Sequence, residues 1–487
     1  MWRIWIGVLT ATACLSGLVV SAATEPVSKV TRSSIVERLQ PQAVPFDALP
    51  ASRSIGGKRC LKRGVERVSK GVTFVCRKKG KALTWVKKPK PTSLPVTSPE
   101  PLYEPPTSIG AAVQTCRLAE DSWQRRQYSD QASGFPALEK YVPHQSTVRM
   151  ALIPIDWSDA PGDPTFTQSI LTQTQKLTDW YDYVSEGRLK VEWVVNPNWI
   201  RLPGSVNSYA VPYSGDNQAT ANFFNQVIPA VDSAFDFRGI QVANFLLPQG
   251  QSVVRESVQE WPWNQIPALS TNEGRLTSAT AAGAFFERAP REYWSYWAHE
   301  FGHVLQLAHI GSSRQWSSMT GYDIMGSQDG PTRELSGWMR FLAGWLSDDQ
   351  VHCQEKSNLQ PTKIMLNPLT QLTPGVKAAI IRVSPTEAII IESRRPNKWS
   401  CSTVNNTAYL TSGVLVYTYD ATKGTQEEFL EAVRPDGRAI VSTSCPSSPE
   451  PNSLLQSGES VTVKGVTISV LSGGSSNRYD TVNVSTS

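Results

Sequence analysis

The sequence predicts a mixed α/β domain followed by an all-β, sandwich-like domain, with a small disulfide-stapled basic module in front of both. Strand-like and helix-like apolar patterns alternate upstream of Trp345, and short β-branched runs separated by turn residues fill the chain beyond it. The basic module is predicted because Lys and Arg crowd around Cys60 and Cys76. With 487 residues, the chain is also too long for one ordinary domain.

Residues 1–23 have the pattern of a secretory signal peptide. Arg3 gives a basic start, an apolar run extends from Ile4 to Val20, and small residues follow up to Ala23. A membrane anchor is the alternative, since the run is near the lower limit for a span. No later segment reaches spanning length, so we expect a mature protein without a transmembrane span, secreted or held at the cell envelope. Residues 24–55 show no periodicity and are interpreted as a tether or propeptide segment.

Residues 56–88 are interpreted as the basic module. Between Lys58 and Lys90 there are thirteen Lys or Arg residues and one acid, Glu66. Outside a cell, a module of this charge suits anionic cell-envelope polymers or lipid headgroups, and we expect no nucleic acid partner. A solvated basic face without a dedicated partner is the open alternative. The proline-rich residues 89–108 then predict a stiff linker.

The cysteines predict disulfides rather than a thiolate metal site. Seven cysteines are present, and one of them, Cys14, lies in the signal segment, which leaves an even number in an exported chain. Several pairings are formally open. Short separations favour Cys60–Cys76 and Cys401–Cys445, with Cys116–Cys353 as the remainder. No C-x-x-C spacing occurs, so we do not interpret these residues as metal ligands.

The α/β domain is expected over residues 109–347. Its patterns alternate between buried strands and amphipathic helices, which is typical of a layered domain. Strands are expected at 148–159, 188–202 and 239–248, and helices at 166–187 and 222–235.

The all-β domain is expected over residues 348–487. Its runs are rich in Val, Ile and Thr, and Gly, Pro, Asn and Ser divide them. Two clear strands are EAIIIESR at 387–394 and GVLVYTYD at 413–420. One segment, residues 425–433, has the pattern of a short helix instead.

A helix with two histidines gives the strongest chemical signal in the chain. Three of the five histidines fall inside the segment YWAHEFGHVLQLAHIGSS. On a helix, His299 and His303 project from one face and can hold one metal ion. Glu300 is rotated by about 100° from His299, which suits it to act as a general base beside the metal. The spacing therefore predicts a zinc site of the hydrolytic type.

The third ligand expected for a catalytic zinc is His309. To reach the ion, the chain has to leave the helix after about Leu305 and turn back. Glu334, with Asp323 behind it, is the alternative third ligand, because a downstream carboxylate can take this role.

Two carboxylate-rich loops leave a Ca²⁺ role open without predicting one. These loops are DWSDAPGDP, which overlaps the end of the first expected strand, and GSQDGPTRE, which ends at Glu334. Neither has the fixed spacing of a calcium-binding loop, so we interpret both as solvated loops.

The histidine segment resembles the zinc-dependent metzincin endopeptidases, whose pattern is H-E-x-x-H-x-x-G-x-x-H followed by a methionine turn. Met325 in YDIMGS matches that methionine. Together with SGWMRFLAGWL, IIIESRRP and GVLVYTYD, this segment is similar to the secreted M6 peptidases typified by immune inhibitor A and to gametolysin-like peptidases. The resemblance covers about residues 145–485. It implies a metzincin-like zincin domain, one catalytic Zn²⁺ and protein or peptide substrates.

Two positions depart from that pattern. Gln306 replaces the glycine at which the chain turns towards the third ligand, where left-handed backbone angles cost a residue with a side chain about 1 kcal/mol or more. No tyrosine follows Met325 closely. The leading prediction is a secreted zinc endopeptidase in which Glu300 is the general base. Two alternatives remain open, the first favoured by Gln306 and the second not separable by sequence. They are a catalytically inactive surface binding protein with the peptidase fold, and a zinc hydrolase of non-peptide bonds.

Overall fold

The chain divides into two compact units, residues 1–96 and 97–487, which are described separately. The computed structural model describes residues 57–69, 72–79, 81–88, 102–127, 130–213, 216–255, 257–260, 269–283, 292–311, 317–330, 332–400, 412–435, 453–474 and 478–487. The signal and tether segments, most of the linker, and Cys401 with Cys445 lie outside these residues and stay predictions. None of the described helices is long and apolar enough to cross a membrane.

The first unit is a three-stranded antiparallel sheet of order β1-β2-β3. Its strands are β1 Glu66–Ser69, β2 Val72–Lys79 and β3 Ala82–Lys87. Phe74 and Cys76 are buried, and the predicted disulfide between Cys60 and Cys76 is confirmed. So small a unit buries little apolar surface, which is the situation in which a disulfide contributes most to stability.

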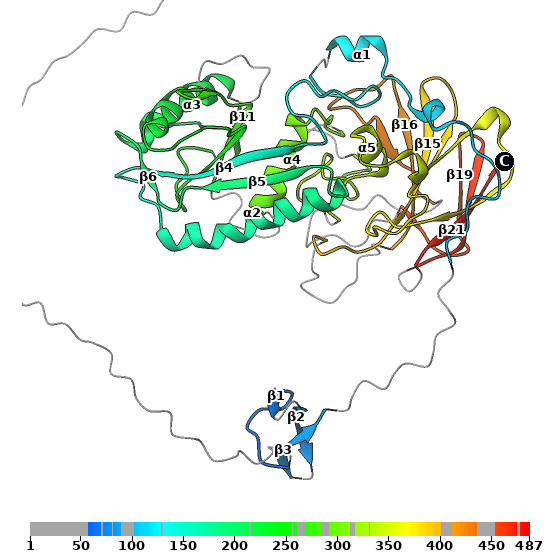
Figure 1. Ribbon diagram of the computed structural model, residues 1–487, viewed down its shortest axis with the longest axis horizontal. Helices are drawn as coiled ribbons and strands as arrows, with labels where there is room; N and C mark the ends of the chain where they lie inside the picture. The colour runs from blue at the N-terminus through cyan, green and yellow to red at the C-terminus, as the bar shows by residue number, and fades with distance from the viewer. Residues whose placement is uncertain are drawn as a thin grey trace, which may run out of the picture. The chain divides into compact units, whose positions relative to one another are not determined.

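The larger unit contains a mixed sheet of order β5-β4-β7-β11-β8, in which β8 is the antiparallel edge strand and β6 pairs with β4 (Figure 1). The other neighbours in this order are parallel. Its strands are β4 Thr147–Asp156, β5 Lys190–Val195, β6 Ile200–Arg201, β7 Val242–Leu246, β8 Ser257–Glu260 and β11 Ser278–Ala282. A two-stranded ribbon consists of β9 Ser270–Thr271 and β10 Gly274–Arg275.

Helices cover both faces of this sheet, as expected from the alternating patterns. In Figure 1, α2 lies on one side of β4 and β5, and α3 lies on the other. Met150 and Leu152 of β4 share a core with α2 and α4, whereas Ile153 and Ile155 pack with α3. The main helices are α2 Pro164–Val184, α3 Asn217–Asp232 and α4 Tyr293–Val304, with shorter helices α1 Ser122–Gln127 and α5 Gly337–Leu342. Single 3₁₀ turns are η1 Val113–Cys116, η2 Val206–Tyr209, η6 Asp348–Gln350 and η7 Lys356–Asn358.

Beyond α5 the unit is a sandwich of two sheets, with orders β12-β14-β15-β16-β17 and β13-β21-β20-β19, and with β18 paired to β16. Val and Ile side chains from both sheets form one apolar layer between them. The strands are β12 Val351–Glu355, β13 Thr362–Leu366, β14 Ala378–Arg382, β15 Glu387–Arg394, β16 Gly413–Asp420, β17 Leu430–Ala432, β18 Leu454–Leu455, β19 Ser460–Val463, β20 Val466–Ser472 and β21 Asp480–Thr486.

The short helix predicted at residues 425–433 is wrong. Leu430 pairs with Tyr419 and Ala432 pairs with Tyr417, so this segment ends in the strand β17. Both residues are buried in a hydrophobic core to which β16 also contributes. Tertiary strand pairing has therefore overridden a local helical pattern.

One hydrophobic core contains residues from both sides of position 347. It includes Trp297 and Met325 of the α/β part and Tyr417 of the sandwich. The predicted disulfide Cys116–Cys353 is also confirmed, and it joins the segment before β4 to β12. The site described next lies where these parts meet.

Candidate metal centre

Helix α4 is buried along its whole length, with an apolar and aromatic surface around its two histidines. Residues of α2 and α4 share one core. The start of α4 is held by ion pairs, because Glu292 contacts both Lys176 and Arg333. At the other end, His144 Nε2 lies 2.6 Å from the carbonyl oxygen of Leu305, which agrees with a structural role for that histidine. The helix is therefore a rigid platform for the side chains it carries.

The structure brings all three predicted histidines together. The ring centroids of His299 and His303 are 4.8 Å apart, and His309 lies 5.2 Å from His299 and 5.8 Å from His303. The ligand atoms of His299, Glu300 and His303 all lie within 4.8 Å of one another. These four side chains are the candidate metal centre.

Each of the three imidazoles is oriented by a backbone carbonyl. His299 Nδ1 lies 2.7 Å from the oxygen of Ile324, and His303 Nδ1 lies 3.0 Å from that of Leu307. His309 Nδ1 lies 2.7 Å from the oxygen of Gly311. A carbonyl only accepts, so each Nδ1 carries the hydrogen and donates it, which leaves the Nε2 lone pair for a metal. This is the hydrogen-bonding arrangement that fixes the orientation of metal-ligating histidines.

Burial also sets the protonation of these groups. It lowers the pKa of His299 well below the ordinary value and that of His303 to about 3, with help from the neighbouring imidazoles. The pKa of His309 is lowered for the same reason. The three rings are therefore neutral at pH 7, the form that binds a metal. Burial raises the pKa of Glu300 to about 8, which is the range in which a carboxyl group can both take up and release a proton.

Met325 packs directly against α4 at Gly302. A Cβ atom added to Gly302 would lie 2.5 Å from Met325 Sδ, so the glycine is what allows this close approach. The backbone of Met325 is fixed on both sides, because Asp323 Oδ1 accepts its N–H at 2.8 Å and its carbonyl oxygen accepts the N–H of Ile310 at 3.1 Å. The methionine therefore connects the helix to the segment that carries His309.

Gln306 adopts the left-handed conformation that its position requires, with φ of 62°. Its side chain is only 1% exposed and makes two hydrogen bonds. Oε1 accepts the N–H of Lys140 at 2.6 Å, and Nε2 donates to the carbonyl oxygen of Asp130 at 3.2 Å. The backbone oxygen of Gln306 accepts the N–H of Ala132 at 2.7 Å. The chain thus turns as a glycine would allow, and the extra side chain ties the turn to residues 130–140.

The segment after this turn is held by a loop of the sandwich. Thr425 Oγ1 accepts the N–H of His309 at 3.0 Å, and the N–H of Gln426 donates to the oxygen of His309 at 2.9 Å. The N–H of Gly311 donates to the oxygen of Glu427, also at 2.9 Å. These three loop residues support the site, and nothing in the local sequence pattern points to them.

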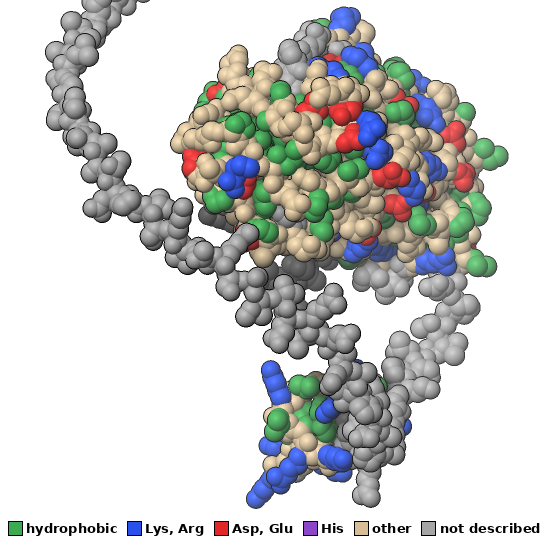
Figure 2. All heavy atoms as spheres, turned by 60° about the vertical axis from the view of Figure 1, so that its left-hand side comes forward, with side chains coloured by type: hydrophobic (Ala, Val, Ile, Leu, Met, Phe, Trp, Pro, Cys, Tyr) green, Lys and Arg blue, Asp and Glu red, His purple; other side chains and the backbone are tan. Residues whose placement is uncertain are grey.

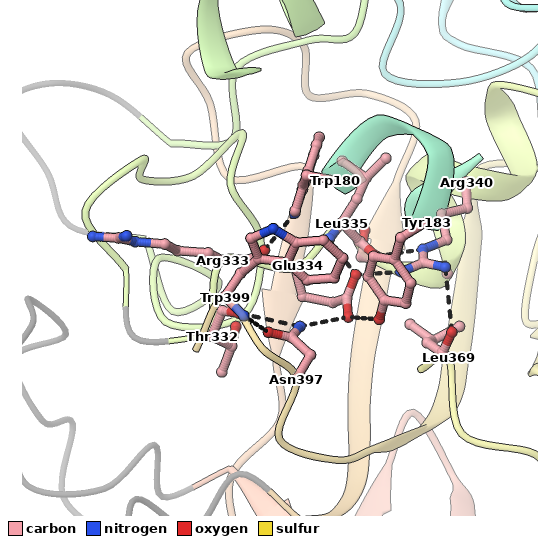
Figure 3. A network of polar contacts seen from close by, with 12 residues as sticks. Trp180, Tyr183, Thr332, Arg333, Glu334, Leu335, Arg340, Leu369, Asn397 and Trp399 are labelled. Carbon is pink, nitrogen blue, oxygen red and sulfur yellow. Dashed lines mark hydrogen bonds and ion pairs between the residues drawn. The ribbon is translucent and has the colours of Figure 1, made fainter. Parts of the chain in front are cut away.

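Glu334, the alternative third ligand, belongs to a different network (Figure 3). Its carboxylate contacts Arg340 and the hydroxyl of Tyr183, and it accepts from Asn397 Nδ2 at 3.1 Å. Burial alone would raise the pKa of Glu334, but the charges of Arg340 and Arg394 outweigh it and lower the pKa. In this structure Glu334 is therefore the partner of a buried cation.

Two other groups of carboxylates are also occupied by protein donors. Asp323 was the second choice, after Glu334, as an alternative ligand. It is buried and accepts the N–H groups of Met325 and Ser336, each at 2.8 Å. In the first acidic loop, Asp156 pairs with Arg201, and Asp163 caps α2. These contacts suit structural roles, and no calcium site is proposed.

Comparisons with known proteins add little to this geometry. No family model matches the chain, and no curated protein matches it. Among solved structures, metalloproteinase-II from Bacteroides fragilis is similar over 53% of this chain and 70% of that chain, at 14% identity and a TM-score of 0.21. This similarity is too distant to carry an argument about function. The metzincin and M6 resemblance therefore stays a prediction.

Proposed function

We propose that this chain is a secreted zinc-dependent endopeptidase. One observation carries the proposal: three neutral histidines, each fixed through Nδ1 by a carbonyl, lie with their ring centroids 4.8 to 5.8 Å apart, and the carboxyl group of Glu300 adjoins two of them. Three protein nitrogen ligands leave one open coordination position, which is the pattern of catalytic zinc. His299, His303 and His309 would hold the ion. When bound, zinc supplies Lewis acidity towards a water molecule and a substrate carbonyl group.

Glu300 is the residue assigned to proton transfer. Its carboxyl group adjoins the ligand nitrogens of His299 and His303 and is buried, so its charge is sensitive to a nearby cation. As a carboxylate it takes a proton from the attacking water molecule. As a carboxylic acid it then donates that proton to the leaving amine. The peptide bond is broken, and water supplies the new hydroxyl group and the new N–H.

Two further observations support the proposal. Gln306 adopts the left-handed turn, so the replacement of glycine does not by itself favour an inactive binding protein. The disulfides Cys60–Cys76 and Cys116–Cys353 suit an exported protein, because such bonds persist in oxidising compartments.

Casein hydrolysis by the purified mature protein tests the proposal. We expect cleavage that stops on chelation, returns with zinc, and is absent in Glu300→Ala. A folded, zinc-loaded protein that leaves casein intact would contradict endopeptidase activity. Hydrolysis of small esters or amides by such a protein would then indicate a zinc hydrolase of non-peptide bonds.

A further inference from the structure

The first unit carries an unusual density of exposed positive charge. Its described residues include eleven Lys or Arg and one acid, Glu66, and all eleven cations are exposed. They are Lys58, Arg59, Lys62, Arg63, Arg67, Arg77, Lys78, Lys79, Lys81, Lys87 and Lys88. Among these described residues, Lys88 and Glu66 form the one ion pair, at 2.6 Å and half exposed to solvent. Pairing within the unit therefore leaves most of its charge available to a partner.

These cations occupy both faces of the sheet. Side chains alternate along a strand, so Arg77 and Lys79 of β2 share one face. Lys78 lies on the opposite face, which it shares with Phe74 of the same strand. Arg67 of β1 is paired with Phe74, so its side chain lies on that face too. In Figure 2 the blue side chains of this small unit project in several directions. A flat surface can contact only one face at a time, whereas a flexible linear polymer can follow both.

Among the described residues of this unit, no aromatic side chain is fully exposed. Exposed aromatic side chains are the groups on which unpaired bases stack. Phe74 is buried, and Trp85 is only partly exposed. Proteins that bind single-stranded nucleic acid combine a positive groove with exposed aromatic platforms. The recognisable chemistry is therefore repeated negative charge without bases.

We propose that the first unit binds a linear cell-envelope polymer with a phosphodiester-linked polyol backbone. The binding free energy would come mainly from the release of counterions as Lys and Arg neutralise successive phosphates. This would hold the chain at the cell envelope. Such binding needs no peptidase activity, so its failure would leave the proposed function untouched.

Binding of the full mature chain to purified poly(glycerol phosphate) tests the proposal. Two matched double variants each remove one Arg and one Lys. Arg67→Gln with Lys78→Gln alters one face, and Arg77→Gln with Lys79→Gln alters the other. Arg126→Gln with Lys363→Gln in the larger unit is the control. All these variants change exposed side chains, so the fold is retained.

We expect each first-unit variant to weaken binding by about 10-fold or more. The slope of log affinity against log salt is negative, and its magnitude should fall by about 2. The control variant should change affinity by less than about 2-fold. The absence of salt-dependent binding by the unaltered chain would overturn the proposal.

Two parallel arms test the choice of partner. Single-stranded DNA of matched charge should bind more weakly than the polyol polymer, and equal binding would overturn that choice. Vesicles of phosphatidylglycerol test a lipid surface, because Leu61 is 100% exposed and Val68 is 67% exposed. Tighter binding to vesicles than to polymer, impaired by only one of the two double variants, would also overturn it.

Discussion

The two halves of the candidate metal centre are built in different ways. His299 and His303 stand four residues apart on one buried helix, so their relative position follows from helix geometry alone. His309 follows a left-handed turn at Gln306, which is bonded to residues 130–140, and the segment that carries His309 is held by residues 425–427. A local pattern therefore places two of the proposed ligands, and long-range contacts place the third.

The largest expected effect lies in the helical half. Glu300→Gln removes the proposed general base and keeps the shape of the side chain. We expect casein cleavage to fall by about 100-fold to 10,000-fold, because general acid–base catalysis contributes rate factors of this size. Zinc content should stay at the level of the unaltered protein. Glu273→Gln, on an exposed turn, serves as the control, and an equal loss there would point to a general defect.

A second change affects the buried ion pair between Glu334 and Arg340, which supports the segment that orients His299. The backbone oxygen of Glu334 accepts the N–H of Ile324, whose own oxygen accepts from His299. Glu334→Gln leaves the buried cation of Arg340 without its partner, and we expect the free energy of unfolding to fall by about 3–5 kcal/mol. Denaturant titration measures this loss. A loss below about 1 kcal/mol would show that the pair is dispensable.

The same residue predicts a pH dependence. The pKa of Glu334 is lowered in the folded protein, so its carboxylate form is favoured there. Its contribution to stability is fully present above its unfolded pKa of about 4.3 and is lost as pH falls through the lower folded pKa. Unfolding measured across this acid range should therefore be less pH-dependent in Glu334→Gln. An unchanged dependence would assign it to other carboxyl groups.

A smaller effect is expected in the long-range half. Thr425→Val removes the hydroxyl that accepts from His309 and that also contacts Gln131. We expect zinc affinity to fall by about 10-fold to 100-fold, the range typical of groups that orient metal ligands. Competition with a chromophoric chelator measures this affinity. Thr425→Ser should restore it, and failure of this rescue would indicate a packing defect instead.

The smallest expected effect separates backbone strain from hydrogen bonding at Gln306. Gln306→Gly removes the left-handed strain but also removes the bonds to Lys140 and Asp130, for a net loss of about 1–2 kcal/mol in stability. Gln306→Ala keeps the strain and loses the same bonds, so it should be about 1 kcal/mol less stable than the glycine variant. Thermal unfolding compares the two. The reverse order would contradict the left-handed turn.

Sequence patterns predicted the parts of this molecule that depend on local geometry. The spacing of His299 and His303, the alternating strands and helices, and the disulfide Cys60–Cys76 are all found in the structure. The disulfide Cys116–Cys353 joins residues 237 apart and was predicted only because these two cysteines remained after the local pairs. The contacts of Thr425 with His309 were not predictable, because 116 residues separate them and no local period connects them. The prediction of a helix at 425–433 was wrong for the same reason, because strand pairing with the distant β16 determines the conformation of this segment.

X-ray absorption at the zinc edge, on the zinc-loaded protein and on His309→Ala, tests most directly whether the long-range half completes the site. We expect three imidazole nitrogens at about 2.0–2.1 Å in the unaltered protein and two in the variant. The same number of histidine ligands in both proteins would show that His309 does not bind the metal. The two-part construction of the site would then be wrong.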